Sequence, residues 1–329
     1  MVSCDSRKST VPTGGMASVQ ANAHNEDRAR IATRDGLTIA TVADGHGSHV
    51  VSQFVVDKLP EELFKRISRS SWQPSITAAF VHVDNLLRDI MFSSASESSW
   101  NAGSCALAAI VDDSAVTVAN CGHSRALLIE RTGQPSCSSR FVSDSHSADN
   151  EGEQARLRSL HPDERDVVHC KHKIVELDTD GNHIKSVRWA ACYVKGRLQA
   201  TRSFGDFYLK DIRASEVCPN LVPAGAVFTP PYIEAVPSLV SFERQKGSVL
   251  VLASDGLWDY LSQEEVTSIV DTLRNKAENE IAEALIEKAL DVAADATNGE
   301  LSLTELKDMQ PGTDKRNIHD DITAVVLFL

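Results

Sequence analysis

The sequence contains no hydrophobic run long enough to cross a bilayer. Its most apolar stretches, such as LTIATVA and ITAVVLFL, have seven or eight residues, whereas a membrane-spanning helix needs about 20. The N-terminus also lacks the apolar segment of a secretory signal. It begins Met-Val, which excludes N-myristoylation of this form. We therefore expect neither a membrane span nor secretion.

The sequence also lacks closely spaced pairs of cysteines. The seven cysteines are an odd number and are scattered singly, without a CxxC motif. This distribution argues against a disulfide framework and a thiolate zinc site, and it favours a reducing compartment. A cysteine hydrolase built on Cys105 or Cys192 with a histidine has no spacing signal to support it either.

The sequence has fewer basic than acidic residues. The chain has 33 Lys and Arg against 46 Asp and Glu, a formal charge of −13, and no Lys/Arg tract. Such a charge repels nucleic acid and anionic lipid at long range, so neither is an expected partner. An acidic surplus fits a protein that collects divalent cations, although many soluble proteins are acidic for other reasons.

The 329 residues have an ordinary globular composition, with 42% hydrophobic and 24% charged residues. Short β-branched runs bounded by turn residues predict strands, and apolar residues at spacings of three and four predict helices. The predicted strands cover residues 37–43, 105–111, 115–120, 125–130, 248–253 and 322–328. The predicted helices cover residues 76–90, 266–273 (behind a capping box from Ser262 to Glu265) and 281–293.

The order of these elements predicts a single domain. Residues 1–15 are small, polar and interrupted by Pro and Gly, so we expect a flexible N-terminal arm. Residues 16–329 show no internal repeat and no Pro/Ser-rich linker. Strands occur at both ends of this part, with helices between them, which favours an α+β domain over a series of βαβ units.

Carboxylates stand beside the ends of several predicted strands: Asp44, Asp255, the pair Asp320–Asp321 and the pair Glu26–Asp27. Asp44 and Asp255 are each followed by glycine, which lets the backbone approach a ligand closely. Carboxylates gathered in one cleft all stay ionised only when cations neutralise them. Oxygen ligands suit Mg²⁺ or Mn²⁺, and two such ions about 4 Å apart could support displacement at phosphorus. Any single Asp-Gly can also be read as a turn.

In their order along the chain, these segments resemble the metal-dependent serine/threonine phosphatases of the protein phosphatase 2C family. The matching stretches run from about residue 16 to the last strand: NEDR, VADGHGS, AGSCALAAIV, VANCGHSRALL, VSDSHSADNEGEQARL, GRLQATRSFGDFYLK, LVLASDGLWDYLS and HDDITAVV. ANAHNEDR, TPPYIEAVPSL and RNIHDDIT are more similar to the branch with pyruvate dehydrogenase phosphatase and related plant enzymes. The resemblance implies a central β-sandwich of two antiparallel sheets flanked by pairs of α-helices, with the site at one end of the sandwich.

The resemblance also implies roles for individual residues. Asp44 would bridge two Mg²⁺ or Mn²⁺ ions, and the carbonyl of Gly45 would ligate one of them. Asp255 and Asp320 would hold the other ion, and Glu26 would act through metal-bound water. Positions behind these ligands, or at a third and weaker metal, would be taken by Asp27, Asp206, Asp321 and His123.

His46 is the predicted general acid. It lies two residues after Asp44, and an imidazole with a pKa near 7 can protonate a leaving alkoxide, although a lone histidine is more often structural. Many family members carry a phosphate-binding arginine a few residues before the Glu-Asp pair, but residues 21–24 contain none. We consider His24 or Arg28 as a substitute, with Arg28 equally readable as a surface residue. Weak phosphate affinity would follow if neither substitutes.

His123 is a second departure from the family pattern. The family has Gly-Asp-Ser-Arg where this chain has Gly-His-Ser-Arg. Imidazole is a poorer partner than carboxylate for Mg²⁺. The third metal site is therefore doubtful: His123 either empties it or, when protonated, pairs with Asp255 and partly replaces the third ion's charge.

Two segments could select substrates or partners: a charged insert at residues 162–195 and the flap region at residues 207–232. Three residues of the insert invite a metal reading: His169, Cys170 and His172. No second ligand pair follows at zinc-like spacing, and DTDGN lacks the glutamate of a calcium loop. A solvated hairpin that turns at residues 180–182 is the alternative.

The leading hypothesis is a monomeric enzyme that hydrolyses phosphoserine and phosphothreonine in proteins. A dinuclear Mg²⁺ or Mn²⁺ centre would supply a metal-bridging water as the nucleophile. The alternative is a weakly active or inactive relative that binds phosphoproteins as a regulatory module. We expect a soluble, intracellular and cytoplasmic protein, and the resemblance to pyruvate dehydrogenase phosphatase leaves a mitochondrial location open.

Overall fold

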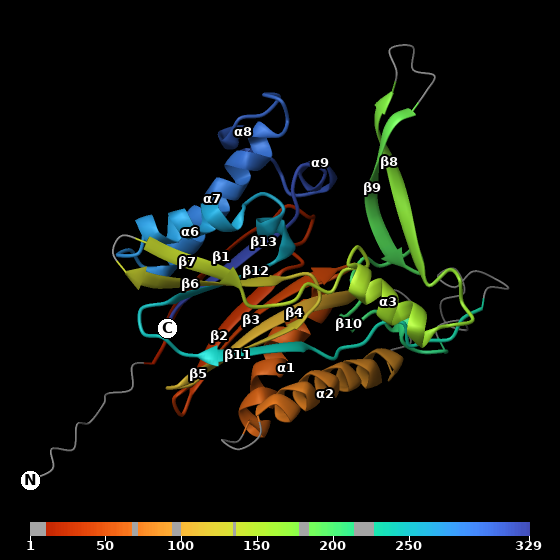
Figure 1. The fold of residues 1–329 in the computed structure, drawn as a ribbon, viewed down its shortest axis with the longest axis horizontal. Helices are drawn as coiled ribbons and strands as arrows, with labels where there is room; N and C mark the ends of the chain where they lie inside the picture. The colour runs from red at the N-terminus through yellow and green to blue at the C-terminus, as the bar shows by residue number, and fades with distance from the viewer. Residues whose placement is uncertain (1–10, 68–71, 94–99, 134–135, 178–183, 214–226) are drawn as a thin grey trace, which may run out of the picture.

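The computed structural model describes residues 11–67, 72–93, 100–133, 136–177, 184–213 and 227–329, with side chains except at 132–136 and 172–190. Two antiparallel sheets pack face to face, and helices cover both outer faces (Figure 1). One sheet has the order β1 (Thr13–Val19), β13 (Ile322–Phe328), β12 (Val249–Ala253), β6 (Arg125–Gly133) and β7 (Ser136–Phe141). The other has the order β11 (Ser238–Glu243), β5 (Ala115–Cys121), β4 (Gly103–Val111), β3 (Leu37–His46) and β2 (Arg28–Arg34), with β10 (Phe204–Gly205) on β4.

Helices form the outer layers. α1 (His49–Arg66) and α2 (Trp72–Ser93) lie on the β3 sheet, while α6 (Gln263–Thr272) and α7 (Glu278–Asp295) lie on the β13 sheet (Figure 1). The shorter elements are α3 (Glu151–Leu160), η2 (Phe207–Leu209), α5 (Asp255–Trp258), α8 (Leu303–Asp308) and α9 (Thr313–Arg316). These layers confirm the predicted α+β class and the sandwich that the resemblance implied.

Strand alternation divides the core into three apolar layers. On β3, Ala40 and Val42 face the interior of the sandwich, whereas Ile39 and Ala43 face α1 and α2. Successive side chains of a strand point to opposite faces. Asp44 therefore continues the interior row at the point where the apolar packing ends. Because both faces of each sheet are covered, residues pointing either way are apolar, and these strands appear in the sequence as almost continuous hydrophobic runs.

The predicted elements are present, with changes at their boundaries. β3 runs on through Asp44 and His46, so Asp44 lies within the strand rather than after it. The expected arm of residues 1–15 is wrong for its last three residues, because β1 begins at Thr13 and pairs with β13. Residues 1–10 lie outside the described part. The capping box at Ser262 is present in α6.

Helix α1 was not predicted, and Pro60 in its middle explains why. Proline has no N–H to donate and normally interrupts a helix. Here Arg30 Nη1 lies 3.4 Å from the carbonyl oxygen of Val56, the acceptor that Pro60 cannot bond. A residue from β2 thus compensates for the lost helical hydrogen bond.

The charged insert forms a hairpin of β8 (Val168–Leu177) and β9 (Ile184–Val194), which projects from the sandwich (Figure 1). The predicted turn at 180–182 and the side chain of His172 lie outside the described part. Cys170 and Cys192 lie opposite each other and form a disulfide, which we had not expected. The two cysteines are 22 residues apart in the sequence and meet because the register of the β8–β9 pairing places them opposite each other. Their sequence spacing alone does not indicate this contact. The disulfide also rules out Cys170 as a metal ligand and Cys192 as a nucleophile.

Within the described ranges, we find no helix with the length and apolar character required to cross a bilayer.

Candidate metal centre and active site

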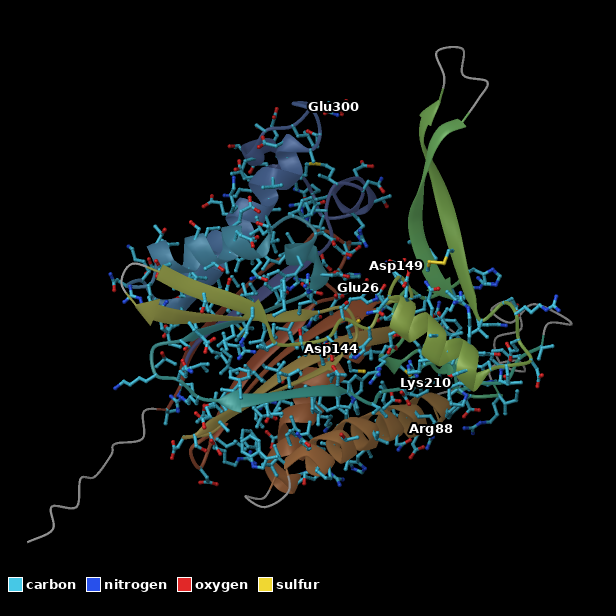
Figure 2. The ribbon with its side chains drawn as sticks, in the orientation of Figure 1. Glu26, Arg88, Asp144, Asp149, Lys210 and Glu300 are labelled. Carbon is cyan, nitrogen blue, oxygen red and sulfur yellow. A yellow bond between two sulfur atoms is a disulfide. The ribbon has the colours of Figure 1, made fainter. Side chains whose placement is uncertain are left out.

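The candidate site lies at one end of the sandwich, where β3 ends and three other segments converge. Figure 2 labels Glu26 at this end of the sandwich. Asp44 and His46 project from the same face of β3, because they are two residues apart in a strand. Between them, Gly45 is required by close packing: a Cβ there would overlap the carbonyl oxygen of Glu26 and Ser52 Oγ. The glycine thus allows the Glu26 segment to cross the end of β3.

Asp44 and Asp255 form a hydrogen-bonded pair of carboxyl groups. Burial raises the pKa of Asp44 well above its usual range, and the charges of Asp255 and Asp27 add to that effect. Burial also acts against ionised Asp255, but a hydrogen bond and the charge of His123 outweigh it and lower the pKa of that carboxyl. Within the pair, the proton is therefore held more strongly at Asp44 than at Asp255.

His123 lies where the sequence suggested, beside Asp255. Its Nδ1 is 3.6 Å from Asp255 Oδ2, and its backbone N–H donates to the sulfur of Cys105 over 3.4 Å. Its buried Nε2 has no hydrogen-bond partner within the described residues. Burial raises the pKa of the Cys105 thiol well above its usual range, so this cysteine is poorly suited to be a nucleophile.

The neighbours Asp320 and Asp321 have different surroundings. Asp321 is buried, and its carboxylate accepts the backbone N–H groups of Ala21 (2.6 Å), Asn22 (3.0 Å) and Glu26 (2.7 Å). It fixes the loop that presents Glu26. Asp320 remains partly exposed and pairs with other groups, so it is the carboxylate of the two that is more accessible to an ion.

Glu26 and Asp27 come from this loop and point into the same region. Burial, with the charge of Asp321, raises the pKa of Glu26. Burial raises the pKa of Asp27 well above its usual range, although a hydrogen bond from Ser254 Oγ (2.7 Å) opposes this shift. Asp27 thus connects the Glu26 loop to Ser254, directly before Asp255.

His46 is held by Asp206, a contact between residues 160 positions apart. His46 Nε2 lies 2.9 and 2.8 Å from the two carboxylate oxygens of Asp206. Asp206 is fully buried and also accepts a hydrogen bond from Ser203 Oγ (2.6 Å). Burial disfavours protonated His46, but the charge and hydrogen bond of Asp206 outweigh this effect and raise the pKa of the imidazole. Gly103 makes the approach possible, since a Cβ there would overlap both side chains.

The two residues considered for phosphate binding, His24 and Arg28, have other contacts. Arg28 Nη1 donates to the carbonyl oxygens of Asn25 and Asp27, both at 2.6 Å, and its Nε donates to Gln53 Oε1 at 2.8 Å. The His24 ring lies 5.9 Å from the ring of His49. Arg28 therefore stabilises the turn that carries Glu26, and three of its hydrogen bonds would compete with a phosphate group.

Sequence reasoning missed two charged residues of the site. Arg316 Nη2 lies 2.6 Å from Asp320 Oδ2, at the i,i+4 spacing that could have indicated the pair. Asp259 lies one turn beyond Asp255, and burial, with the charges of Asp255 and Asp320, raises the pKa of Asp259 to about 6.

The donor groups fit Mg²⁺ or Mn²⁺ in their chemistry. Within the described residues, no three His, Cys, Asp or Glu side chains are already arranged to hold an ion. The carboxyls pair with other groups instead: Asp44 with Asp255, and Asp320 with Arg316. The raised pKa of Asp44, Glu26 and Asp320 reflects burial and mutual repulsion. A bound cation would relieve that repulsion, and oxygen donors suit these two metals.

Comparison with known proteins identifies the family. The sequence profile of protein phosphatase 2C matches residues 14–297. Probable protein phosphatase 2C 67 of Arabidopsis thaliana is 33% identical, over 95% of this chain and 82% of the relative. Probable protein phosphatase 2C 61 of Oryza sativa subsp. japonica is 31% identical, over 95% of this chain and 80% of the relative.

The fold agrees with a solved structure. The serine-threonine phosphatase 2C from Toxoplasma gondii superimposes with a TM-score of 0.63 at 18% identity, over 96% of this chain and 94% of that one. The family profile, two relatives that match over most of their length and the shared sandwich agree. The chain therefore belongs to the protein phosphatase 2C family of metal-dependent protein serine/threonine phosphatases.

Proposed function

We propose that this protein hydrolyses phosphoserine and phosphothreonine in phosphoproteins at the end of its sandwich, with two Mg²⁺ or Mn²⁺ ions held there. The observation that carries the proposal is the convergence of Glu26, Asp44, Asp255 and Asp320 beside the Asp206-supported His46. Asp44, Asp255, Asp320 and the carbonyl of Gly45 would hold the ions, and Glu26 would act through water. When bound, such ions lower the pKa of water and offset charge on phosphoryl oxygens.

His46 has the properties required of the general acid in this proposal. Its side chain is 31% exposed, so a leaving oxygen can reach it. Burial opposes protonation of the imidazole, but the charge and hydrogen bond of Asp206 outweigh burial and raise its pKa, which favours the protonated form. An imidazolium can then donate its proton to the serine or threonine oxygen as the phosphorus–oxygen bond breaks.

The direct test is Mn²⁺-dependent release of inorganic phosphate from a phosphothreonine peptide. We expect activity that EDTA abolishes and that excess Mn²⁺ restores. Activity that resists EDTA but is lost on thiol modification would instead support a cysteine hydrolase. A protein that binds the phosphopeptide without releasing phosphate would support the alternative of a regulatory binding module.

Replacing His123 by aspartate tests the third metal position. An aspartate beside Asp255 adds a carboxylate where the histidine now lies 3.6 Å away, so a further cation would be needed to offset the repulsion. For His123→Asp we expect one additional Mn²⁺ per chain by titration calorimetry. Activity at saturating metal should rise by roughly 10-fold, the scale on which outer residues tune metal sites.

His123→Asn is the matched control, because it removes the imidazole without adding charge. It should leave the number of bound ions unchanged. If His123→Asp shows the same stoichiometry and activity as this control, His123 has no bearing on a third metal.

A further inference from the structure

The phosphate group of a substrate needs a cation that the expected segment does not supply. Residues 21–24 contain no arginine, and Arg28 is occupied by two carbonyl oxygens and Gln53. The surrounding site is strongly acidic, so a dianionic phosphate ester would be repelled unless positive charge is provided locally. Bound metal ions would supply part of that charge.

Arg316 brings positive charge to this place from a distant part of the chain. Burial raises the pKa of Glu26, Asp259 and Asp320, and the charge of Arg316 partly opposes each of these shifts, so the guanidinium acts on several carboxyls of the site. The Arg316 side chain is 47% exposed, which leaves it accessible to a ligand. Within the described residues, Asp320 is the only ion-pair or hydrogen-bond partner of the guanidinium group, and that contact involves Nη2.

Arg316 lies beside residues 21–24, the segment that lacks an arginine. The N–H of Gly312, directly before α9, donates to the carbonyl oxygen of Ala21 over 2.8 Å, which attaches the helix to this segment. Asp320 then joins the two: its Oδ1 accepts from Asn22 Nδ2 (3.2 Å), and its Oδ2 contacts Arg316. Arg316 and Asn22 therefore approach the same carboxylate from its two oxygens.

We propose that Arg316 is the phosphate-binding residue of this enzyme and takes the place of the arginine missing from residues 21–24. The proposal rests on the metal centre proposed above. Asp320 is the counter-ion of Arg316 in the structure, and an Asp320 engaged with a cation would give up that role. The guanidinium, with five N–H donors in a planar fork, would then be available to bind phosphoryl oxygens.

Three variants test this assignment: Arg316→Ala, Arg316→Lys and the control Lys246→Ala. Lys246 is exposed and lies far from the site. The N–H of the next residue, Gly247, donates to the carbonyl oxygen of Leu329, which follows the end of β13 opposite to Asp320. The control therefore removes the same positive charge away from the site. For each variant, KM and kcat are measured on a phosphothreonine peptide. Titration calorimetry gives the affinity for inorganic phosphate in saturating Mn²⁺, and separately the affinity for Mn²⁺ alone.

For Arg316→Ala we expect a roughly 10- to 100-fold loss of phosphate affinity, with a comparable rise in KM and a smaller change in kcat. Arg316→Lys should fall between wild type and Arg316→Ala, because lysine retains the charge but not the fork. Mn²⁺ should bind Arg316→Ala at least as tightly as wild type, since a competing cation is removed. Lys246→Ala should match wild type throughout.

The outcomes separate this assignment from the metal centre. Unchanged phosphate affinity in Arg316→Ala, with tighter Mn²⁺ binding, would show that Arg316 only neutralises Asp320 and would overturn the proposal. Wild-type protein that binds no Mn²⁺ would overturn the metal centre and the role of Arg316 together.

Discussion

Asp44→Asn is expected to abolish Mn²⁺-dependent phosphatase activity, with a loss of roughly 10³-fold or more, because charge stabilisation by a metal is worth several kcal/mol. Asp44 is the carboxyl on which the charges of Asp255, Asp27 and Asp320 converge. An amide keeps the size of the side chain but cannot carry the negative charge with which Asp44 would hold a cation. The measurement is phosphate release from a phosphothreonine peptide across a Mn²⁺ titration.

The same variant should have the opposite effect on stability. Because folding raises the pKa of Asp44, the folded protein binds this proton more tightly than the unfolded chain. The free energy of unfolding of metal-free wild type therefore falls as pH rises through the range above the unfolded pKa. Asp44→Asn removes this cost, so without metal it should unfold at a higher temperature than wild type at neutral pH.

Asp163→Asn provides the control for Asp44→Asn, because Asp163 is exposed in the insert and the substitution makes the same chemical change away from the site. Mn²⁺ should raise the unfolding temperature of wild type and of this control but not of Asp44→Asn. Full Mn²⁺ stabilisation and activity in Asp44→Asn would remove Asp44 from the metal centre.

His46→Ala is expected to reduce turnover of alkyl phosphates by about 10²- to 10⁴-fold, the usual contribution of a general acid. Aryl phosphates should be affected far less, because their leaving groups need little protonation. Comparing kcat for phosphothreonine peptide and p-nitrophenyl phosphate measures the difference. Equal losses on the two substrates would reject the general-acid role.

Asp206→Asn separates positioning from proton donation. Asp206 raises the pKa of His46 through its charge and hydrogen bond, and asparagine removes the charge. The protonated imidazole should then be lost at a lower pH, so the alkaline limb of the kcat profile on phosphothreonine peptide should shift to lower pH. An unshifted limb would mean that this limb does not report on His46.

Local sequence patterns predicted much of the fold because they depend on neighbours along the chain. Strand β13 and helix α6 follow from apolar spacing and a capping box. Strand β1 was missed because its small residues give little local signal, and it forms by pairing with β13 some 300 residues away. Helix α1 was missed because Pro60 signals a break that Arg30 compensates from another strand.

The sequence alone was enough to identify the candidate site residues, because residue type and spacing along the chain single them out. They are the acidic residues, His46, His123 and the position where an arginine is missing. The tertiary structure decided what each of these residues contacts. Adjacent residues with similar chemistry, Asp320 and Asp321, differ because one binds the amides of the Glu26 loop and the other meets Arg316. Asp206 is hydrogen-bonded to His46, and Gly312 before α9 is hydrogen-bonded to Ala21. These partners are too far apart in the sequence for local spacing patterns to predict the contacts. The physical reason is that hydrogen bonds and charges act over a few ångströms in space, and only folding brings distant segments within that range.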